Sequence, residues 1–402
     1  MNDILDRLGL TSVINATGTV TRLGASRMAP EVVAAMAEAA DRSIDMAHLQ
    51  GRASDIIAGC TGAEAGIVTA GAAAGLLVGA ASCMTGLDPV KMARLPDTEG
   101  MRNEFLVARS HRNSYDHAVR AAGARFIEVG LPDRRTGCGV RDTEVWEIEA
   151  AISDRTAGIL YLAAADARPS LAAVVRAAHR AKVPVLVDAA AQLPPAANLR
   201  RFIGEGADLV VFSGGKGIGG PSASGILCGR RALVGAALLQ QLDLDYLFED
   251  WSPPSNLVDK QSLPGVPRHG IGRGCKVGKE QIVGLLVALQ RFAVEDDAAR
   301  NQRFAAIVDA LVAAVARVPA LRVRAVADLG HGGMPLAEVI VEPGRGFTAA
   351  QVAATLRASS PSIEVDATEA DIGRLMLAPT CLSTEDAALI GAAFARAVAR
   401  PA

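Results

Sequence analysis

The chain has 402 residues, half of them hydrophobic, and a formal net charge of −2 at pH 7. This length allows two or three domains, and the composition is that of an ordinary soluble globular protein. The near-neutral charge argues against a broad basic surface for nucleic acid or an anionic membrane, so we predict neither as a partner.

Cysteine usage and the start of the chain bear on its compartment. The six cysteines form no CxxC pair, and the first residues are acidic where a secretory signal would be basic. These features predict a reduced, cytoplasmic protein without a metal cluster. The cysteines are Cys60, Cys83, Cys138, Cys228, Cys275 and Cys381.

Residues 65–87 carry no charge and are long enough to span a membrane. Because this stretch is rich in glycine and alanine, we predict a strand, a tight turn and a helix there instead. Further short apolar runs alternate with helical stretches, the pattern of a mostly parallel sheet covered by helices. Seven strands are predicted, at residues 67–69, 105–108, 126–129, 158–162, 183–187, 208–212 and 224–228.

Prolines and glycines between residues 251 and 278 predict an irregular connector, and a helix follows from Lys279. Beyond it, helices at 303–316 and 384–399 and strands at 321–326 and 336–341 predict a smaller α+β domain. We therefore predict an α/β fold in three parts. Residues 1–45 form an N-terminal segment on the small domain or a partner subunit, 46–295 the large domain and 296–402 the small C-terminal domain.

Lys216 is the most informative single residue. Only six of the 41 basic residues are lysines, and Lys216 follows an apolar run inside the turn Ser213-Gly214-Gly215-Lys216-Gly217. Arginine cannot form an imine, whereas a desolvated lysine loses its proton and becomes a nucleophile. This position suits a Schiff-base lysine, and a charge in a surface loop fits the surroundings equally well.

Two other turns follow predicted strands. Gly71, Ala72 and Ala73 precede a helix, where small residues let backbone N–H groups approach a phosphate, although such turns are more often simple packing. Asp188 ends an apolar strand, where a carboxylate either keeps a pyridinium nitrogen protonated or caps a helix. Ligands of open α/β sheets collect at this edge.

Further polar residues extend the candidate site. His111 follows a strand and has a flat ring that can stack on a cofactor, although a lone loop histidine is more often a surface or capping residue. The Ser213 hydroxyl is close enough in sequence to Lys216 to bind the same phosphate. Arg273, Lys276 and Lys279 are the densest cationic group, either for an anion or as a solvated helix end.

Taken together, these segments resemble the fold-type I pyridoxal-phosphate (PLP) enzymes, and within them the selenocysteine-synthase-like group. The resemblance runs over most of the chain. It rests on Ile14-Asn15-Ala16-Thr17-Gly18, Thr61-Gly62-Ala63-Glu64-Ala65, His111-Arg112-Asn113-Ser114-Tyr115-Asp116-His117-Ala118, Val187-Asp188-Ala189-Ala190-Ala191-Gln192, Ser213-Gly214-Gly215-Lys216 and Lys276-Val277-Gly278-Lys279-Glu280.

The resemblance implies a role for each candidate residue. Lys216 would bind PLP as a Schiff base, Asp188 would pair with its ring nitrogen and His111 would stack on its ring. The phosphate would lie at Gly71, Ala72, Ala73 and Ser213. Gln192 is a further cofactor contact, although some relatives place it one position earlier, at Ala191. The group's shared active site implies a homodimer or higher homo-oligomer in which Arg273 and Lys276 bind substrate at the partner's site.

The resemblance also implies the reaction. It is α,β-elimination from a β-hydroxy amino acid or an amino sugar acid such as D-glucosaminate 6-phosphate, with Lys216 as the base and a 2-oxo acid and ammonia as products. Selenium transfer to seryl-tRNA is an alternative, but the chain has neither the basic excess nor the added N-terminal domain for it. Racemase, aldolase and aminotransferase reactions start in the same way, and a non-catalytic binding protein is the alternative of another class.

Overall fold

A computed structural model describes residues 4–131, 142–342, 344 and 346–399. Cys138 lies outside these residues. The chain divides into two compact units, Met28–Val294 and Met1–Arg27 together with Glu295–Ala402. Residues 28–45, grouped above with the N-terminal segment, fall in the larger unit, because helix α2 (Pro30–Ala40) buries Val32 in its core.

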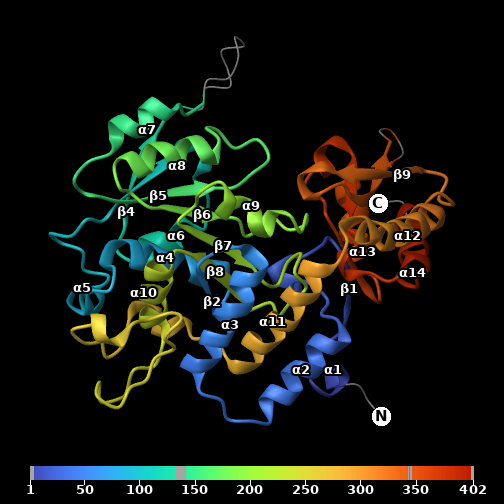
Figure 1. Ribbon diagram of the computed structural model, residues 1–402. Coiled ribbons are helices and arrows are strands. Elements are labelled where there is room, and N and C mark those ends of the chain that lie inside the picture. Colours follow the sequence, from blue (N-terminus) through green and yellow to red (C-terminus); the bar gives the residue numbers. More distant parts are fainter. Residues whose placement is uncertain (1–3, 132–141, 343, 345, 400–402) are drawn as a thin grey trace. The chain divides into compact units, whose positions relative to one another are not determined.

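A seven-stranded sheet forms the centre of the larger unit (Figure 1). The strand order is β2-β8-β7-β6-β5-β3-β4, and β8 runs antiparallel to both of its neighbours while the other pairs are parallel. This confirms the predicted α/β class and the mostly parallel seven-stranded sheet. The strands are β2 (Ala65–Thr69), β3 (Glu104–Ala108), β4 (Arg125–Val129), β5 (Thr156–Leu162), β6 (Val185–Asp188), β7 (Leu209–Ser213) and β8 (Gly225–Gly229).

Helices cover both faces of this sheet, and the alternation of side chains along each strand fills two separate apolar clusters. On β7, Val210 and Phe212 point into one cluster and Leu209 and Val211 into the other. The first cluster lies under α2, α3 (Met46–Thr61), α7 (Val145–Ala151), α8 (Leu171–Arg180), α9 (Asn198–Gly204) and α11 (Lys279–Val294). The second lies under α4 (Ala72–Thr85), α5 (Pro89–Arg94), α6 (Asp116–Ala121) and α10 (Arg231–Gln241).

The uncharged stretch at 65–87 forms β2 and α4, as predicted. Glycines bring α4 close to the sheet: a Cβ on Gly75 would lie 3.0 Å from Val211 Cγ1, and one on Gly79 3.2 Å from Leu186 Cδ1. Among the described residues, no helix is long and apolar enough to cross a membrane.

The smaller unit contains a three-stranded antiparallel sheet, a two-stranded parallel sheet and helices around one apolar core. The predicted strands and helices of this part all overlap observed elements, whereas α1, β1, β11, β12 and α13 were not predicted. The elements are α1 (Ile4–Arg7), β1 (Val13–Ala16), α12 (Asp297–Val315), β9 (Leu321–Asp328), β10 (Met334–Val341), α13 (Ala349–Arg357), β11 (Ser362–Val365), β12 (Arg374–Leu377) and α14 (Asp386–Ala399).

Candidate active site

The sheet topology brings several of the predicted residues to one edge. Strands β2, β7, β6, β5 and β3 all end at the same side of the sheet, because β8 is the antiparallel strand. Asp188 is the last residue of β6, Ser213 the last of β7, and His111 and Gly71 directly follow β3 and β2. This carboxyl edge is where open α/β sheets bind ligands.

Lys216 and Asp188 are electrostatically coupled at this edge. Burial lowers the pKa of the Lys216 amine, and the Asp188 carboxylate partly opposes that change. Burial raises the pKa of Asp188, against a hydrogen bond from the Ala190 N–H (3.0 Å) and the charge of Lys216. Desolvation therefore favours the neutral form of both groups. The Lys216 amine becomes more nucleophilic, and a further cation would stabilise the Asp188 carboxylate.

The turn before α4 lies on the same edge. Gly71 has φ +96°, a conformation that favours glycine, and it caps α4 without a side chain to accept from the first helical N–H groups. Thr69 fixes the turn because its Oγ1 donates to the Gly71 carbonyl at 2.9 Å. The helix thus begins with N–H donors from Ala72 and Ala73 and no acidic residue in its first turn.

Ser213 lies two strands from this turn. It pairs with Gly225 of β8, which in turn pairs with Thr69 of β2, so Ser213 and Thr69 are about 10 Å apart. By the alternation along β7, Ser213 points to the sheet face that α4 covers, as Val211 does. A Cβ on Gly225 would lie 2.5 Å from the Gly71 carbonyl carbon, so glycine is required there for the turn to approach the strand.

His111 is buried, at 4 % exposure, and its ring is held on two sides. Its Nδ1 accepts a long hydrogen bond from the Leu162 N–H (3.4 Å), and Tyr161 meets the ring edge-on at 4.9 Å. This bond assigns the proton to Nε2, which is buried and has no partner among the described residues. Burial also lowers the pKa of His111, against the charges of Asp142 and Asp166, so the ring is neutral.

Ion pairs with α6 and β4 hold the loop that carries His111. Arg112 forms ion pairs with Asp116 and Glu128, and Arg109 also binds Glu128, at 3.1 Å. These contacts tie the loop to α6 and to β4, so His111 is placed by a rigid segment.

Gln192 lies in the turn after β6 and is half-buried. Its backbone carbonyl accepts from Asn198 Nδ2 at 2.7 Å, which holds the turn against α9. The lysine turn packs on the same segment, because a Cβ on Gly217 would lie 2.2 Å from the Leu193 carbonyl oxygen. The turns after β6 and β7 are therefore in direct contact next to Lys216.

Two of the three cations in the predicted cluster have partners within the chain. Arg273, in a 3-10 turn at Ile271–Cys275, donates to Asp243 at 2.6 Å, and Lys279 donates to Glu280 and to the Ala40 carbonyl. Lys276 is exposed. Arg273 was predicted to bind an anion from outside, but within this chain Asp243 is its anion.

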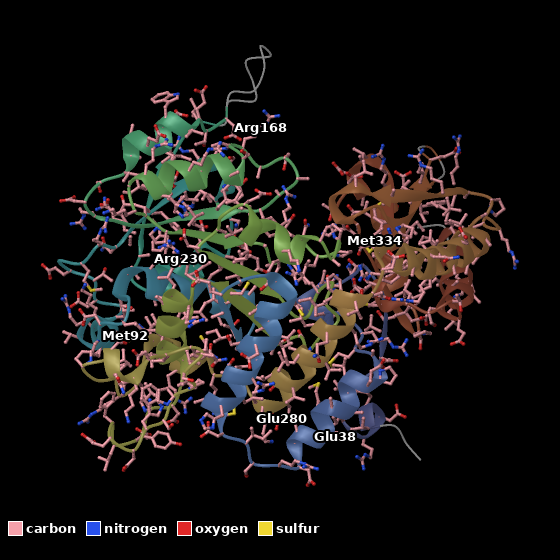
Figure 2. The ribbon with its side chains drawn as sticks, in the orientation of Figure 1. Glu38, Met92, Arg168, Arg230, Glu280 and Met334 are labelled. Atoms are coloured by element: carbon pink, nitrogen blue, oxygen red, sulfur yellow. The ribbon has the colours of Figure 1, made fainter. Side chains whose placement is uncertain are left out.

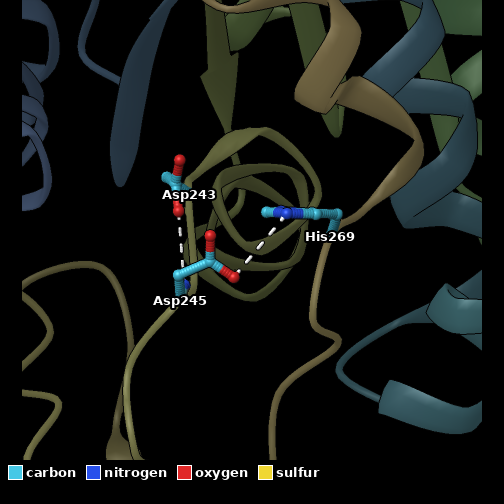
Figure 3. A group of neighbouring side chains, drawn as sticks. All are labelled: Asp243, Asp245 and His269. Carbon is cyan, nitrogen blue, oxygen red and sulfur yellow. Dashed lines mark hydrogen bonds and ion pairs between the residues drawn. The ribbon is translucent and has the colours of Figure 1, made fainter.

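Asp243 also belongs to an exposed group with Asp245 and His269 (Figure 3), whose ligand atoms lie within 4.8 Å of one another. His269 and Asp245 approach to 3.7 Å, and the Asp245 N–H donates to Asp243. The hydrogen bond from Arg273 lowers the pKa of Asp243, so this carboxylate already has a cation. We interpret the group as surface ion pairs.

Several supporting residues were missed from the sequence. Tyr161 and the Gly217–Leu193 contact position His111 and Lys216, and both depend on which strands are neighbours in the sheet. Gly225 carried a signal, since a glycine inside a strand indicates close approach of another backbone.

No protein-family model matches the chain. D-glucosaminate-6-phosphate ammonia lyase of Salmonella typhimurium is 32% identical over 298 residues, which are 72% of this chain and 70% of that protein. The 5'-C-glycyluridine monooxygenase-decarboxylase of a Streptomyces species is 31% identical over 391 residues, 94% of this chain and 88% of that protein.

Solved structures agree with these relatives. A D-glucosaminate-6-phosphate ammonia-lyase structure has a TM-score of 0.82 and 28% identity, with both chains covered completely. An L-seryl-tRNA(Sec) selenium transferase of Solidesulfovibrio magneticus is 31% identical, but the match covers 56% of this chain and 49% of that protein. The chain therefore belongs to the selenocysteine-synthase-like family of fold-type I PLP enzymes, the family of D-glucosaminate-6-phosphate ammonia lyase.

Proposed function

We propose that this protein is a PLP-dependent ammonia lyase that removes ammonia from a β-hydroxy amino sugar acid of the D-glucosaminate 6-phosphate type. The observation that carries the proposal is the coupled pair of Lys216 and Asp188 at the carboxyl edge of the sheet. The D-glucosaminate-6-phosphate ammonia-lyase structure, which matches the full length of the chain, supports the proposal.

The described residues fit PLP in three respects. Asp188 is buried with a backbone N–H as its hydrogen-bond donor, so a protonated ring nitrogen supplies the charge that burial disfavours. The start of α4, with Gly71, Ala72 and Ala73, has N–H donors without a side-chain cap and suits a phosphate, with Ser213 on the same face. His111 Nε2 is a buried donor without a partner among the described residues, as expected of a residue that contacts a bound cofactor.

When bound, PLP supplies an electron sink for the charge that develops at the substrate Cα. In this proposal Lys216 would hold the cofactor. Its amine would also serve as the base for the Cα proton, a role that its lowered pKa favours because more of the amine is neutral near pH 7. Asp188 keeps the ring nitrogen protonated, and His111 covers the ring and shields it from water.

The finer assignments belong to the same proposal. Lys276 and Arg273 bind the substrate's carboxylate or phosphate across a homodimer interface, and Gln192 contacts the cofactor. Arg273 must leave Asp243 or be shared with it for this role, so Lys276, which is exposed, is the stronger candidate. We also propose a cytoplasmic location, in keeping with the five described cysteines, which are all unpaired.

The test is to incubate the PLP-loaded protein with D-glucosaminate 6-phosphate and to follow ammonia and 2-oxo acid together. We expect the two products in equal amounts, and D-glucosaminate without its phosphate to react more slowly. The control is Lys216→Ala. Ammonia without a 2-oxo acid, or no product from any β-hydroxy amino acid in a panel of both configurations, would contradict the proposal.

A second function is favoured by one specific observation. The Streptomyces relative named as a monooxygenase-decarboxylase aligns with 94% of this chain, against 72% for the Salmonella ammonia lyase, at nearly equal identity. Oxidative decarboxylation and elimination both begin by weakening a bond at Cα. Lys216 and Asp188 have the same roles in either reaction.

The requirement for molecular oxygen distinguishes these two functions. Elimination proceeds without oxygen and leaves the substrate carboxylate in the product, whereas oxidative decarboxylation consumes oxygen and releases CO2. We expect ammonia release to continue in an anaerobic chamber. Selenium transfer would require tRNA binding, and a gel shift with seryl-tRNA at physiological salt is expected to show none, in keeping with the net charge of −2.

A further inference from the structure

The larger unit has a cavity at the amino edge of the sheet, opposite the edge that holds Lys216. Its volume is about 570 Å³, and it lies where β5 and β6 begin, where β8 ends and beside the last turn of α4. Ala157 of β5 lines it, while Leu162 ends the same strand at the Lys216 edge, about 17 Å away. The cavity is thus separate from the candidate active site.

Four cationic side chains line this cavity: Lys91, Arg102, Lys182 and Arg230. Glu64 is the acidic residue of the lining, and it accepts from the Arg231 N–H at 2.9 Å. Cys83 also lines the cavity, but burial, followed by the charge of Asp208, raises the pKa of its thiol to about 12, so it adds no negative charge. The lining is therefore strongly positive in a chain whose net charge is −2.

The four cations differ in whether a carboxylate of the protein neutralises their charge. Arg230, labelled in Figure 2, pairs with buried Asp208 at 3.0 Å, and Lys91 reaches Asp88 at 3.7 Å. Arg102 and Lys182 have no carboxylate partner among the described residues. Two positive charges thus face the cavity without an anion of the protein.

Lys182 also occupies a backbone position that lysine disfavours. Its φ is +57°, in the turn after α8, where glycine or asparagine is the usual residue. Lysine there costs stability without any packing gain, since its side chain is exposed. Two of the chain's six lysines, Lys91 and Lys182, lie at this cavity.

Apolar side chains form the remainder of the lining, among them Met84, Met101 and Leu233. Met84 and Met101 are largely buried and Leu233 is half-buried, so an inorganic anion would leave Leu233 in contact with water, whereas a ligand with a flat or apolar part would cover it. We propose that this cavity binds an organic phosphate, with its phosphate at Lys182, Arg102 and Lys91 and its apolar part against Met84, Met101 and Leu233.

The test uses AMP and adenosine as probes, titrated by calorimetry into protein loaded with PLP so that the start of α4 is already filled. We expect one AMP per chain, weaker binding as salt rises, and no measurable binding of adenosine. The variant Lys91→Gln/Lys182→Gln should weaken AMP binding about tenfold or more. Arg230 is left unchanged, because Asp208 depends on it.

The matched control removes two exposed arginines of the same unit that lie outside the cavity, Arg125→Gln/Arg176→Gln, and should bind AMP as the wild type does. Melting temperatures of both variants check that each is folded. The proposal is overturned if AMP does not bind, if adenosine binds equally well, or if the two double variants lose affinity to the same extent.

Discussion

The two edges of the seven-stranded sheet each hold a buried aspartate, and their surroundings differ. Asp208, just before β7, has its carboxylate in contact with the Val185 N–H (2.7 Å), His179 Nε2 (2.9 Å) and Arg230 (3.0 Å). Asp188, at the end of β6, accepts from the Ala190 N–H and has Lys216 as its nearby cation. The Asp208 carboxylate contacts two side chains of neighbouring elements, although its Oδ1 has an ion pair and no hydrogen bond among the described residues, whereas the charge of Asp188 is opposed by Lys216, the proposed cofactor-binding residue.

This difference separates residues that maintain structure from residues that serve chemistry. Burying a charge is costly unless it is paired, and burial raises the pKa of Asp188 despite the nearby charge of Lys216, which favours a functional explanation for this carboxylate. The following five predictions test that distinction, beginning with the largest effect.

Lys216→Ala should abolish turnover, with a fall of about 10,000-fold, because it removes both the attachment point of the cofactor and the base at Cα. Product formation under saturating PLP measures it. Lys260→Ala is a control for the loss of a lysine elsewhere in the unit. Turnover within tenfold of wild type in Lys216→Ala would show that another residue is the base.

Asp188→Asn should lower turnover about 100-fold, because an amide cannot stabilise a protonated ring nitrogen. Stability of the cofactor-free protein should be kept or increased, since burial already disfavours the charged form of Asp188. The raised pKa means that this protein loses stability as pH rises through the folded-state pKa of Asp188, and the asparagine variant should not. Unchanged turnover would contradict the assigned role.

Asp208→Asn should show the opposite behaviour. It should lower the free energy of unfolding by about 2 kcal/mol, because the Val185 N–H, His179 and Arg230 lose their charged acceptor. Turnover per folded molecule should stay near that of wild type. Urea unfolding measures the first effect, and a loss of activity as large as that of Asp188→Asn would erase the contrast between the two edges.

Lys276→Gln should raise KM about tenfold with little change in kcat, because it removes one charged contact to an anionic substrate. The control is Lys279→Gln, since Lys279 is held by Glu280 and the Ala40 carbonyl. Equal effects of the two substitutions would show that the lysines act through overall charge.

His111→Phe should have the smallest of the five effects. It is a change in stability that appears only at acidic pH. Because the folded-state pKa of His111 lies below its ordinary value of 6.5, the unfolded chain takes up the proton first. Stability of the wild type is therefore lost as pH falls from about 6.5 toward the folded-state pKa, and the phenylalanine variant should lose less. Unfolding curves across this range measure the difference, and identical curves would mean that His111 is not buried as a neutral ring.

Local sequence patterns were sufficient for the elements of the central sheet. Apolar runs bounded by glycine and alanine-rich helices identified all seven strands, and the uncharged stretch at 65–87 became β2 and α4. Strands β1 and β11 were missed because each is short and its apolar residues are interrupted by a polar one, Asn15 or Glu364, and the two strands pair across most of the chain.

In the candidate site, too, some features could be predicted from the sequence and others could not. The sequence places Asp188, Lys216, His111 and the Gly71 turn at or just after the ends of strands, and the structure brings these ends to one edge because the strands are parallel. The partner of Arg273 could not be predicted, because Asp243 lies thirty residues away in an irregular segment. Asp208 was assigned only as the start of a strand, since its partners His179 and Arg230 come from two other elements.

The central claim is that Lys216 binds the cofactor covalently. The direct measurement is to load the protein with PLP, reduce it with borohydride, digest it and locate the pyridoxyl group by mass spectrometry. We predict a single modified peptide with the group on Lys216, absent in Lys216→Ala and present in Lys276→Gln. Modification of a different lysine, or none under saturating PLP, would contradict the account.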